Sequence, residues 1–427
     1  MVWGAFLIFV CKNIDMMKLD RYHFKAYFLL AAVFVILGLL FGCNKAQQPD
    51  KKPYLVVLSL DGFRWDYPQH FSTPNLNMMA KEGVHANSLI PCFPTKTFPN
   101  HYSIATGLYP DHHGIIQNSF YVPGIGTFEP TNRQSIMNGA YYEGEPIWLT
   151  AENQGMKSAC YFWVGSEAPI KGKYPSIWLP YNQDLPFTSR IDSVITWLQL
   201  PSEKRPHLIM WYIHQPDEIS HHEGPLAAST GKMISYLDSL VGVFRARLNE
   251  LPIANKVNFV VVSDHGMAKV NENNNLYLDH LVPRYWINMA CGGDIQLNIT
   301  ATPGYKDSLY HRLKKVNHLS VWKKEEVPQR LHYGTNPRIY DLVVLADTGW
   351  NIMLTQPAKI IPGHHGYDNI YPDMHGIFYA VGPAFKNGYE RPSFENIHLY
   401  PLFTHILKLK PAEVDGRLEE VRDMLKN

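Results

Sequence analysis

The stretch YLVVLSLDG, residues 54–62, is a continuous apolar run that ends in Asp61 and Gly62. Two later stretches repeat this form: HLIMWYIHQPD, residues 207–217, and NFVVVSDHG, residues 258–266. Short continuous apolar runs are typical of strands that are buried on both faces of a sheet. Each run therefore predicts an inner strand of a sheet that is covered by helices.

The segment between the second and third runs predicts how these strands are connected. Over residues 226–251, apolar side chains recur at the spacing of one helix face: Met233, Leu237, Leu240, Val241 and Phe244. A strand, a helix and a strand in succession are typical of parallel pairing. The sequence therefore predicts an α/β sandwich with a mostly parallel central sheet that is flanked by helices.

The remaining sequence fits one large domain over residues 54–427. GIFYAVGP, residues 376–383, predicts a late strand of the main sheet, and the charged region over about residues 279–341 predicts a small α/β insertion. The 427 residues carry a net charge of +1. A site for a nucleic-acid polymer would need a basic footprint, so no such partner is expected. We expect a monomer that acts on a small molecule.

The N-terminal segment, residues 1–43, has the pattern of a secretory signal. Residues 26–42 are uncharged and largely apolar, and basic residues precede them. The stretch ends in LLFGC, residues 39–43, which resembles the lipobox of bacterial lipoproteins, and a polar tether follows over residues 44–53. We expect lipid anchoring at Cys43 in the cell envelope, with an uncleaved apolar membrane anchor as the alternative. Either form places the domain outside the cytoplasmic membrane.

Acidic and imidazole side chains gather where the apolar runs end. The carboxyl ends of parallel strands are where such sheets bind ligands. The side chains near these ends are Asp61, Asp217, His221, Asp264 and His265, and a glycine-bounded loop adds His364 and His365. Asp217 and His221 are four residues apart, so one helical turn would place both on one face. Aspartate and histidine together are ligands that zinc and similar ions favour.

The stretch PCFPTKTFPNH, residues 91–101, offers three candidate nucleophiles, which are Cys92, Thr95 and Thr97. Cysteine is intrinsically the better nucleophile, whereas a threonine hydroxyl needs a metal or a base to activate it. Cys92 also begins a stretch that is similar to the Cys-x-Pro-Ser-Arg motif of sulfatases. An alternative register places Thr97 in the nucleophile's position. The residues of this stretch alone leave the choice open.

Six motifs together resemble the nucleotide pyrophosphatase/phosphodiesterase family of the alkaline phosphatase superfamily. They are LSLDGFRWDY, TPNLNMMAKEGV, PTKTFPNHYSIATGLYPDHHGIIQN, PDEISHHEGP, VVSDHGM and GHHGYDN, in that order. The resemblance extends over residues 54–407 and implies an alkaline-phosphatase-like catalytic phosphodiesterase domain. It favours Thr97 as the nucleophile and leaves Cys92 as a small packed side chain.

The same resemblance implies two zinc ions as cofactors. One would be held by Asp217, His221 and His365, and the other by Asp61, Asp264 and His265, with Thr97 facing it and His364 only a neighbour. Thr97 would attack phosphorus to form a phospho-threonine intermediate, which water then releases. Asn118 would donate to a non-bridging phosphate oxygen and stabilise the developing charge.

The substrate depends on a side pocket that the family builds from aromatic residues. Phe98 and Tyr181 would stack on a nucleotide base. Lys96 and Glu167 are the other expected substrate contacts. This pattern favours cleavage of nucleotide diesters or pyrophosphates to nucleoside 5′-monophosphates.

Three departures from the usual nucleotide-cleaving pattern keep an alternative open. These are Val164, Glu167 and Tyr367, at positions where many such members have Pro, Asp and Ser. An aromatic cage with a carboxylate is suited to choline, so a choline-lipid diesterase is the second hypothesis. An inactive surface binding protein is a remote third.

Overall fold

The computed structural model describes residues 52–357 and 359–426. Its main sheet has eight strands in the order β19-β2-β18-β9-β1-β8-β6-β7. Their bounds are β1 (Tyr54–Leu60), β2 (Val84–Ala86), β6 (Ser158–Tyr161), β7 (Ile177–Leu179), β8 (Leu208–Ile213), β9 (Val257–Val262), β18 (Phe378–Val381) and β19 (Tyr389–Arg391). β1 pairs in parallel with both β8 and β9, and β18 is antiparallel to its neighbours β9 and β2. The predicted α/β class and mostly parallel sheet are confirmed.

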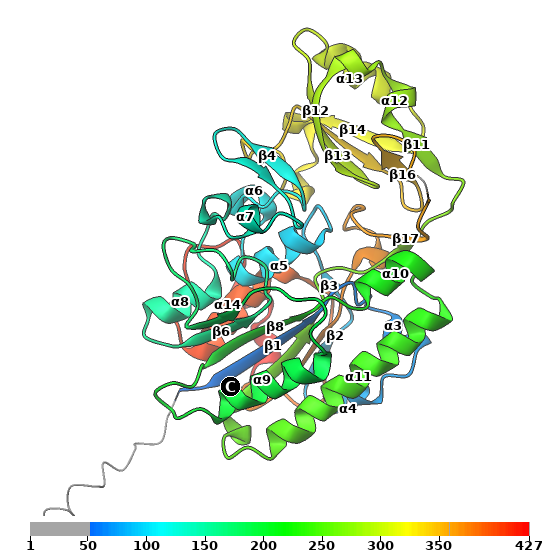
Figure 1. Ribbon diagram of the computed structural model, residues 1–427. Helices are drawn as coiled ribbons and strands as arrows, with labels where there is room; N and C mark the ends of the chain where they lie inside the picture. Colours follow the sequence, from blue (N-terminus) through cyan, green and yellow to red (C-terminus); the bar gives the residue numbers. More distant parts are fainter. Residues whose placement is uncertain (1–51, 358, 427) are drawn as a thin grey trace, which may run out of the picture. The chain divides into compact units, whose positions relative to one another are not determined.

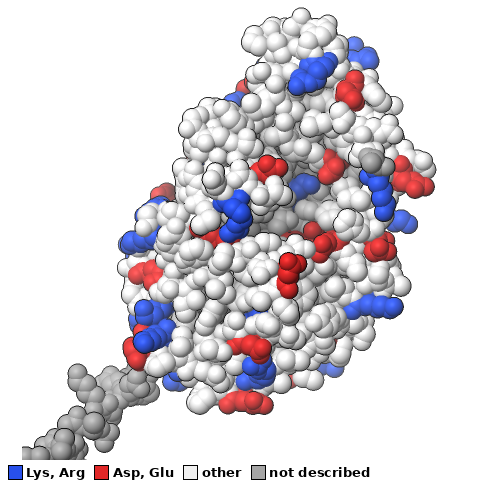
Figure 2. Space-filling view, in the orientation of Figure 1, with Lys and Arg blue, Asp and Glu red and all other residues white. Residues whose placement is uncertain are grey.

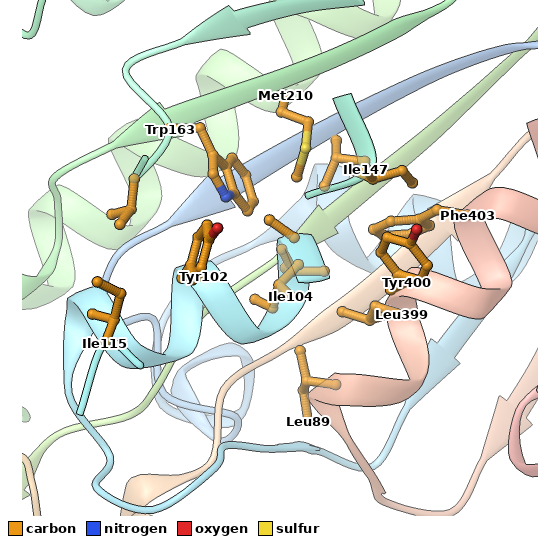
Figure 3. Packing of buried hydrophobic residues seen from close by; sticks show 14 of the residues in the cluster. Leu89, Tyr102, Ile104, Ile115, Ile147, Trp163, Met210, Leu399, Tyr400 and Phe403 are labelled. Atoms are coloured by element: carbon orange, nitrogen blue, oxygen red, sulfur yellow. The ribbon is translucent and has the colours of Figure 1, made fainter. Parts of the chain in front are cut away.

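Helices cover both faces of this sheet (Figure 1). The fully buried strand β1 alternates between them, with Val56 and Leu58 in one core and Leu55 and Val57 in the other. The first core includes α4 (Pro74–Glu82), α9 (Phe187–Gln199) and α11 (Ala228–Asn249). The second includes α5 (Thr97–Thr106), α8 (Ile147–Asn153) and α14 (Leu399–Leu407), and Figure 3 shows its packing. Helix α11 confirms the helix predicted between the second and third apolar runs.

A smaller antiparallel sheet lies beside the main one, with strand order β12-β13-β15-β14. Its parts are β12 (Ile287–Gly293), β13 (Gln296–Ala301), β14 (Leu319–Lys323) and β15 (Leu342–Ala346), with α12 (Leu278–Leu281) and α13 (Lys306–Leu313) on one face. Along β15, Leu342 and Val344 pack with these helices, whereas Val343 and Leu345 join the core that contains α5. The inner strands β13 and β15 are therefore buried on both faces.

The remaining α-helices and strands are short. They are α3 (Tyr67–His70), β3 (Leu89–Ile90), α6 (Pro110–His113), β4 (Phe120–Val122), β5 (Gly126–Phe128), α7 (Arg133–Ile136), α10 (Asp217–Glu223), β10 (Ala268–Lys269), β11 (Asn275–Tyr277), β16 (Asn351–Met353), β17 (Gly363–His364) and β20 (Phe394–Glu395). Of these, β11 and β16 lie with the small sheet. Among the residues described, none of the helices has the length and apolar character to span a membrane. The predicted signal, lipobox and tether over residues 1–51 lie outside the described residues.

Candidate active site

Three aspartates meet at the carboxyl ends of neighbouring strands. Asp61 follows β1, Asp264 follows β9 by two residues, and Asp217 is the first residue of α10, beyond the end of β8. The backbone N–H of Asp217 donates to the carbonyl of Asp61 at 3.0 Å. Gly62 makes this approach possible, because it has a φ of +66° and an added Cβ would lie 2.9 Å from the Cα of Asp217.

One oxygen of each carboxylate is buried without a hydrogen-bond donor. These atoms are Oδ1 of Asp61, Oδ1 of Asp217 and Oδ2 of Asp264. Burial raises the pKa of Asp61 well above its usual range, and the charges of Asp264 and Asp217 raise it further. Burial alone would also raise the pKa of Asp264, but the imidazoles of His265 and His101 outweigh it and lower that pKa. Unpaired buried carboxylates are costly, so this cluster is built to receive cations.

Three histidines present their Nε2 atoms to these carboxylates. Nδ1 of His221, His265 and His365 lies at 2.7–2.8 Å from the backbone carbonyls of Gly363, Gly266 and Thr95, respectively. A carbonyl can only accept, so each Nδ1 carries the proton and each Nε2 offers a lone pair. This arrangement is typical of histidines that ligate metals.

The Nε2 atoms form two adjacent groups that overlap at His265, because ligand atoms of Asp217, His265 and His365 also lie within 4.8 Å of one another. Nε2 of His221 and Nε2 of His365 lie 3.4 Å and 3.6 Å from Asp217 Oδ1. Nε2 of His265 lies 3.3 Å from Asp61 Oδ1 and 3.0 Å from Asp264 Oδ2. The rings of His265 and His365 stack with centroids 3.6 Å apart, which places the two groups side by side. The structure thus brings every sequence-predicted metal ligand into one centre.

Two further histidines adjoin this centre. His101, which the sequence analysis did not single out, lies with Nδ1 3.0 Å from the Thr97 carbonyl and 3.2 Å from Asp264 Oδ2, and with Nε2 2.9 Å from Ser59 Oγ. Both of its nitrogens are engaged, so it joins the backbone of Thr97 to Ser59 beside Asp264. His364 packs edge-on against His221 at 5.4 Å and is buried, so it lies beside the centre. Burial lowers the pKa of His364 to about 2.

Thr97 is the first residue of α5 and the candidate nucleophile that faces this centre. Its Oγ1 lies 3.2 Å from Nε2 of His265. By contrast, the Cys92 thiol donates to Asn396 Oδ1 at 3.0 Å, and burial raises the pKa of Cys92 well above its usual range. Thr95 uses its hydroxyl both to donate to Tyr367 O and to accept from Gly366 N, each at 2.9 Å. The geometry therefore favours Thr97 among the three candidates.

Asn118 and Lys96 line one cavity together with Asp217, His221 and His365. Asn118 Oδ1 accepts from the backbone N–H of Phe98 at 2.9 Å, so its Nδ2 group is the end left to donate to a ligand. Lys96 is buried, and burial lowers its pKa. An added Cβ on Gly366 would lie 2.5 Å from Lys96 Cε, so the glycine gives the lysine room to reach the cavity. Figure 2 shows the surface hollowed on this side, with acidic and basic side chains near the hollow.

A second cavity continues from Thr97 and is mainly aromatic. Its lining includes Phe98, Phe162, Trp163, Val164, Glu167, Tyr181 and Tyr212. Phe98 packs on the core of one sheet face and Tyr181 on the core of the other. Tyr367 does not line either cavity, because it is fully buried and its hydroxyl donates to Trp350 O at 2.9 Å.

The aromatic cavity also contains an ion pair that the sequence analysis missed. Arg133 donates to both carboxylate oxygens of Glu167, and the backbone N–H of Tyr181 donates to Glu167 Oε2 at 3.1 Å. The Glu167 side chain is nearly buried, whereas that of Arg133 is 43% exposed. Glu167 is therefore neutralised within the cavity, and Arg133 retains donors that a ligand can reach. Arg133 carries no local sequence signal, since it lies 34 residues from its partner.

Comparison with known proteins gives a consistent result. The chain matches the family model of type I phosphodiesterase/nucleotide pyrophosphatase over residues 55–368. It is 35% identical to human ectonucleotide pyrophosphatase/phosphodiesterase family member 1, over 90% of this chain and 44% of that protein. It is 33% identical to human family member 5, over 93% of this chain and 83% of that protein. Venom phosphodiesterase 2 of Crotalus adamanteus is 36% identical, over 87% of this chain and 47% of that protein.

The solved structure of murine family member 5 is similar to this one with a TM-score of 0.84 at 34% identity, covering 88% of this chain and 100% of that chain. The fold and the matched family define the class, a phosphoric diester hydrolase with an alkaline-phosphatase-like fold. The chain belongs to the type I phosphodiesterase/nucleotide pyrophosphatase family. It spans less than half the length of family member 1 and of the venom enzyme.

Proposed function

We propose that this protein is a two-zinc phosphodiesterase that cleaves nucleotide diester or pyrophosphate bonds and releases nucleoside 5′-monophosphates. The observation that carries the proposal is the position of Thr97. Its Oγ1 lies 3.2 Å from Nε2 of His265 in the carboxylate and imidazole cluster, and the same residue lines the aromatic cavity. A nucleotide bound with its base in the aromatic cavity would bring its phosphate to the threonine.

The donor set fits two zinc ions. Asp217, His221 and His365 would hold one, and Asp61, Asp264 and His265 the other, with Thr97 facing the second. Three unpaired carboxylate oxygens and three lone-pair imidazole nitrogens supply the mixed oxygen and nitrogen ligands that zinc takes. When bound, a metal pair of this kind stabilises both the attacking and the leaving oxygen of an in-line displacement.

The reaction at phosphorus would proceed in two displacements. Thr97 Oγ forms a bond to phosphorus while the bond to the leaving oxygen breaks, and the leaving group departs with a proton. Asn118 donates from Nδ2 to a non-bridging oxygen that gains charge in the transition state. Water then attacks the threonine–phosphate ester, which releases the 5′-monophosphate and restores the Thr97 hydroxyl. Lys96, which lines the cavity that contains Asp217 and His221, would contact phosphate oxygens.

The state of Glu167 favours a nucleotide over a choline lipid. A choline site needs an unpaired carboxylate or aromatic faces free of competing cations. Here Arg133 occupies both oxygens of Glu167, so a choline cation would face a guanidinium. A base between Phe98 and Tyr181 instead meets two aromatic faces and the remaining donors of Arg133. Tyr367, buried away from both cavities, gives no support to the choline hypothesis.

A solved relative supports the nucleotide assignment and the role of Thr97. One structure of murine family member 5 is described as inactive, carries a threonine-to-alanine substitution and is in complex with AMP. AMP is the kind of product that the proposed reaction releases. We match that threonine with Thr97 as part of the proposal.

The test compares p-nitrophenyl thymidine 5′-monophosphate, p-nitrophenyl phosphorylcholine and p-nitrophenyl phosphate on purified residues 44–427 with zinc. We expect the thymidine diester to have the highest kcat/KM, because only it fills the aromatic cavity. A preference for the choline ester would overturn the nucleotide assignment. A preference for the monoester would overturn the diesterase assignment.

We also propose that the protein is lipid-anchored at Cys43 outside the cytoplasmic membrane. The support is the sequence alone, namely the apolar run over residues 26–42 and the lipobox-like LLFGC. Fractionation of bacterial cells that express the full chain provides the test. We expect Cys43→Ala to reduce membrane-associated protein, and equal retention of variant and wild type would exclude lipidation as the anchor.

A further inference from the structure

A row of buried polar side chains joins the small sheet to the loop that carries Asn118. On β13, Leu297 and Ile299 pack with the small sheet's own helices, so Gln296 and Asn298 point to the opposite face, toward the main core. Gln117 Nε2 donates to Gln296 Oε1, and Gln296 Nε2 donates to Asn298 Oδ1 at 3.2 Å. All three amides are almost fully buried.

Both ends of this row return to the Asn118 loop. Gln117 Oε1 accepts from the backbone N–H of Asn118 at 2.9 Å. At the other end, Asn298 Nδ2 donates to the hydroxyl of Tyr333 at 3.0 Å, and that hydroxyl donates to the carbonyl of Ile116 at 3.1 Å. The loop lies between α6 and β4, so no helix or strand fixes it. Its backbone is held by these side chains instead.

The β12–β13 hairpin approaches the loop as closely as its backbone allows. Gly292 has a φ of +85°, and an added Cβ would lie 2.4 Å from Gln296 O and 3.2 Å from Gln117 Nε2. A larger residue at this position would push the hairpin away from Gln117. The contact between the β12–β13 hairpin and the Asn118 loop therefore depends on the backbone at Gly292 as well as on the side-chain amides.

We propose that Gln117 and Gln296 are positioning residues that hold Asn118 in the geometry needed to donate to the transition state. The small sheet would thereby contribute to catalysis without touching the substrate. The inference rests on the proposed function, because the role of Asn118 is part of that proposal. A donor must lie within a few tenths of an ångström of its productive position to stabilise an oxyanion, so a loosened loop would lower kcat.

The first test is Gln296→Leu, which removes the acceptor of Gln117 at nearly constant volume. We expect kcat for p-nitrophenyl thymidine 5′-monophosphate to fall about tenfold and KM to change less than about twofold. In an Asn118→Ala background, the same substitution should cause no further loss, because the two residues act through one donor. Gln117→Leu breaks the same bond from its other side and should give the same pattern, which keeps the test informative if Gln296→Leu fails to fold.

Asn351→Leu is the matched control. Asn351 is fully buried on β16, and its Nδ2 donates to Asn275 Oδ1 at 2.8 Å, away from the Asn118 loop. It should lower the melting temperature by an amount similar to Gln296→Leu and leave kcat unchanged. A folded Gln296→Leu variant with normal kcat, or one that loses as much activity in the Asn118→Ala background, would overturn the inference. A normal kcat in Asn118→Ala alone would overturn the proposed role of Asn118 and the inference with it.

Discussion

The aromatic cavity and the cavity lined by Lys96, Asn118 and Asp217, here called the metal-side cavity, share Tyr212 in their walls but differ in how their charges are balanced. At the metal-side cavity, which Asp217 lines, and behind it at Asp61 and Asp264, three carboxylates each keep one oxygen without a donor, and imidazole nitrogens face them. In the aromatic cavity, the one carboxylate, Glu167, is taken up by Arg133 and a backbone N–H. The carboxylates of the metal-side cavity need cations to balance their charge. Glu167 in the aromatic cavity already has a cationic partner, Arg133, before any ligand binds.

Because of this difference, we expect a division of labour in which one cavity serves the reaction at phosphorus and the other selects the substrate. The metal-side cavity would bind metals, and the displacement at phosphorus would take place there in the same way for any diester. The aromatic cavity would select the group attached to phosphorus by stacking and by the donors of Arg133. Perturbing the first should lower turnover of all substrates, and perturbing the second should change only the preference among them.

Removal of metal should have the largest effect. Chelation should lower turnover of every diester to background, and added zinc should restore it. The apo protein should also melt at a lower temperature, because Asp61, Asp217 and Asp264 then repel one another and lose ligand stabilisation of about 2.7 kcal/mol at a metal concentration of 100 Kd. Calorimetry with and without zinc measures this shift. An identical melting temperature would contradict the metal centre.

Thr97→Ala should rank next, with a loss of about 10³-fold or more in kcat while the metal content stays unchanged. All six protein ligands other than Thr97 remain in this variant. The comparison variant is Cys92→Ala, which removes the rival nucleophile and should retain turnover, because that thiol is buried against Asn396. Full activity in Thr97→Ala would remove Thr97 from the nucleophile role.

Asn118→Ala should lower kcat by about 10²–10³-fold and leave KM nearly unchanged, because its donor acts on charge that develops in the transition state. The loss should be equal for p-nitrophenyl thymidine 5′-monophosphate and for methyl p-nitrophenyl phosphate, which lacks a base. A loss confined to the thymidine ester would show that Asn118 acts in substrate selection by the aromatic cavity and not in transition-state stabilisation.

Arg133→Leu should change the rate of the displacement at phosphorus least and the preference among substrates most. We expect KM for the thymidine diester to rise about tenfold, and kcat/KM for p-nitrophenyl phosphorylcholine to rise, because Glu167 would then be unpaired. Turnover of methyl p-nitrophenyl phosphate should not change. Arg133→Lys is the control, since it keeps the charge but not the bidentate pair. A uniform loss on all three substrates would contradict the division of labour.

The two cavities also differ in how far the sequence predicts them. Asp61, Asp217 and Asp264 follow apolar runs, and His221 shares a helical turn with Asp217, so short stretches of sequence carry the signal. All of them lie where the main sheet was expected to place them. The sheet itself was predictable for the same reason, because strands buried on both faces leave long apolar runs.

Two side-chain pairs have no such local signal in the sequence: the ion pair in the aromatic cavity and the amide pair that supports Asn118. Arg133 and Glu167 are 34 residues apart, and Gln117 and Gln296 are 179 apart. Each is a common surface residue type, and Glu167, Gln117 and Gln296 become buried only when distant segments pack together. His101 was missed for a related reason, since its role depends on contacts with Ser59 and Asp264 across the site.

The stereochemical course at phosphorus tests the central claim, which is covalent catalysis by Thr97, most directly. A thymidine phosphorothioate diester of known configuration would be hydrolysed in ¹⁸O-labelled water, and the configuration of the product determined. Attack by Thr97 followed by attack by water is two in-line displacements, so we expect overall retention. Overall inversion would show a single direct attack by water and would contradict the threonine intermediate.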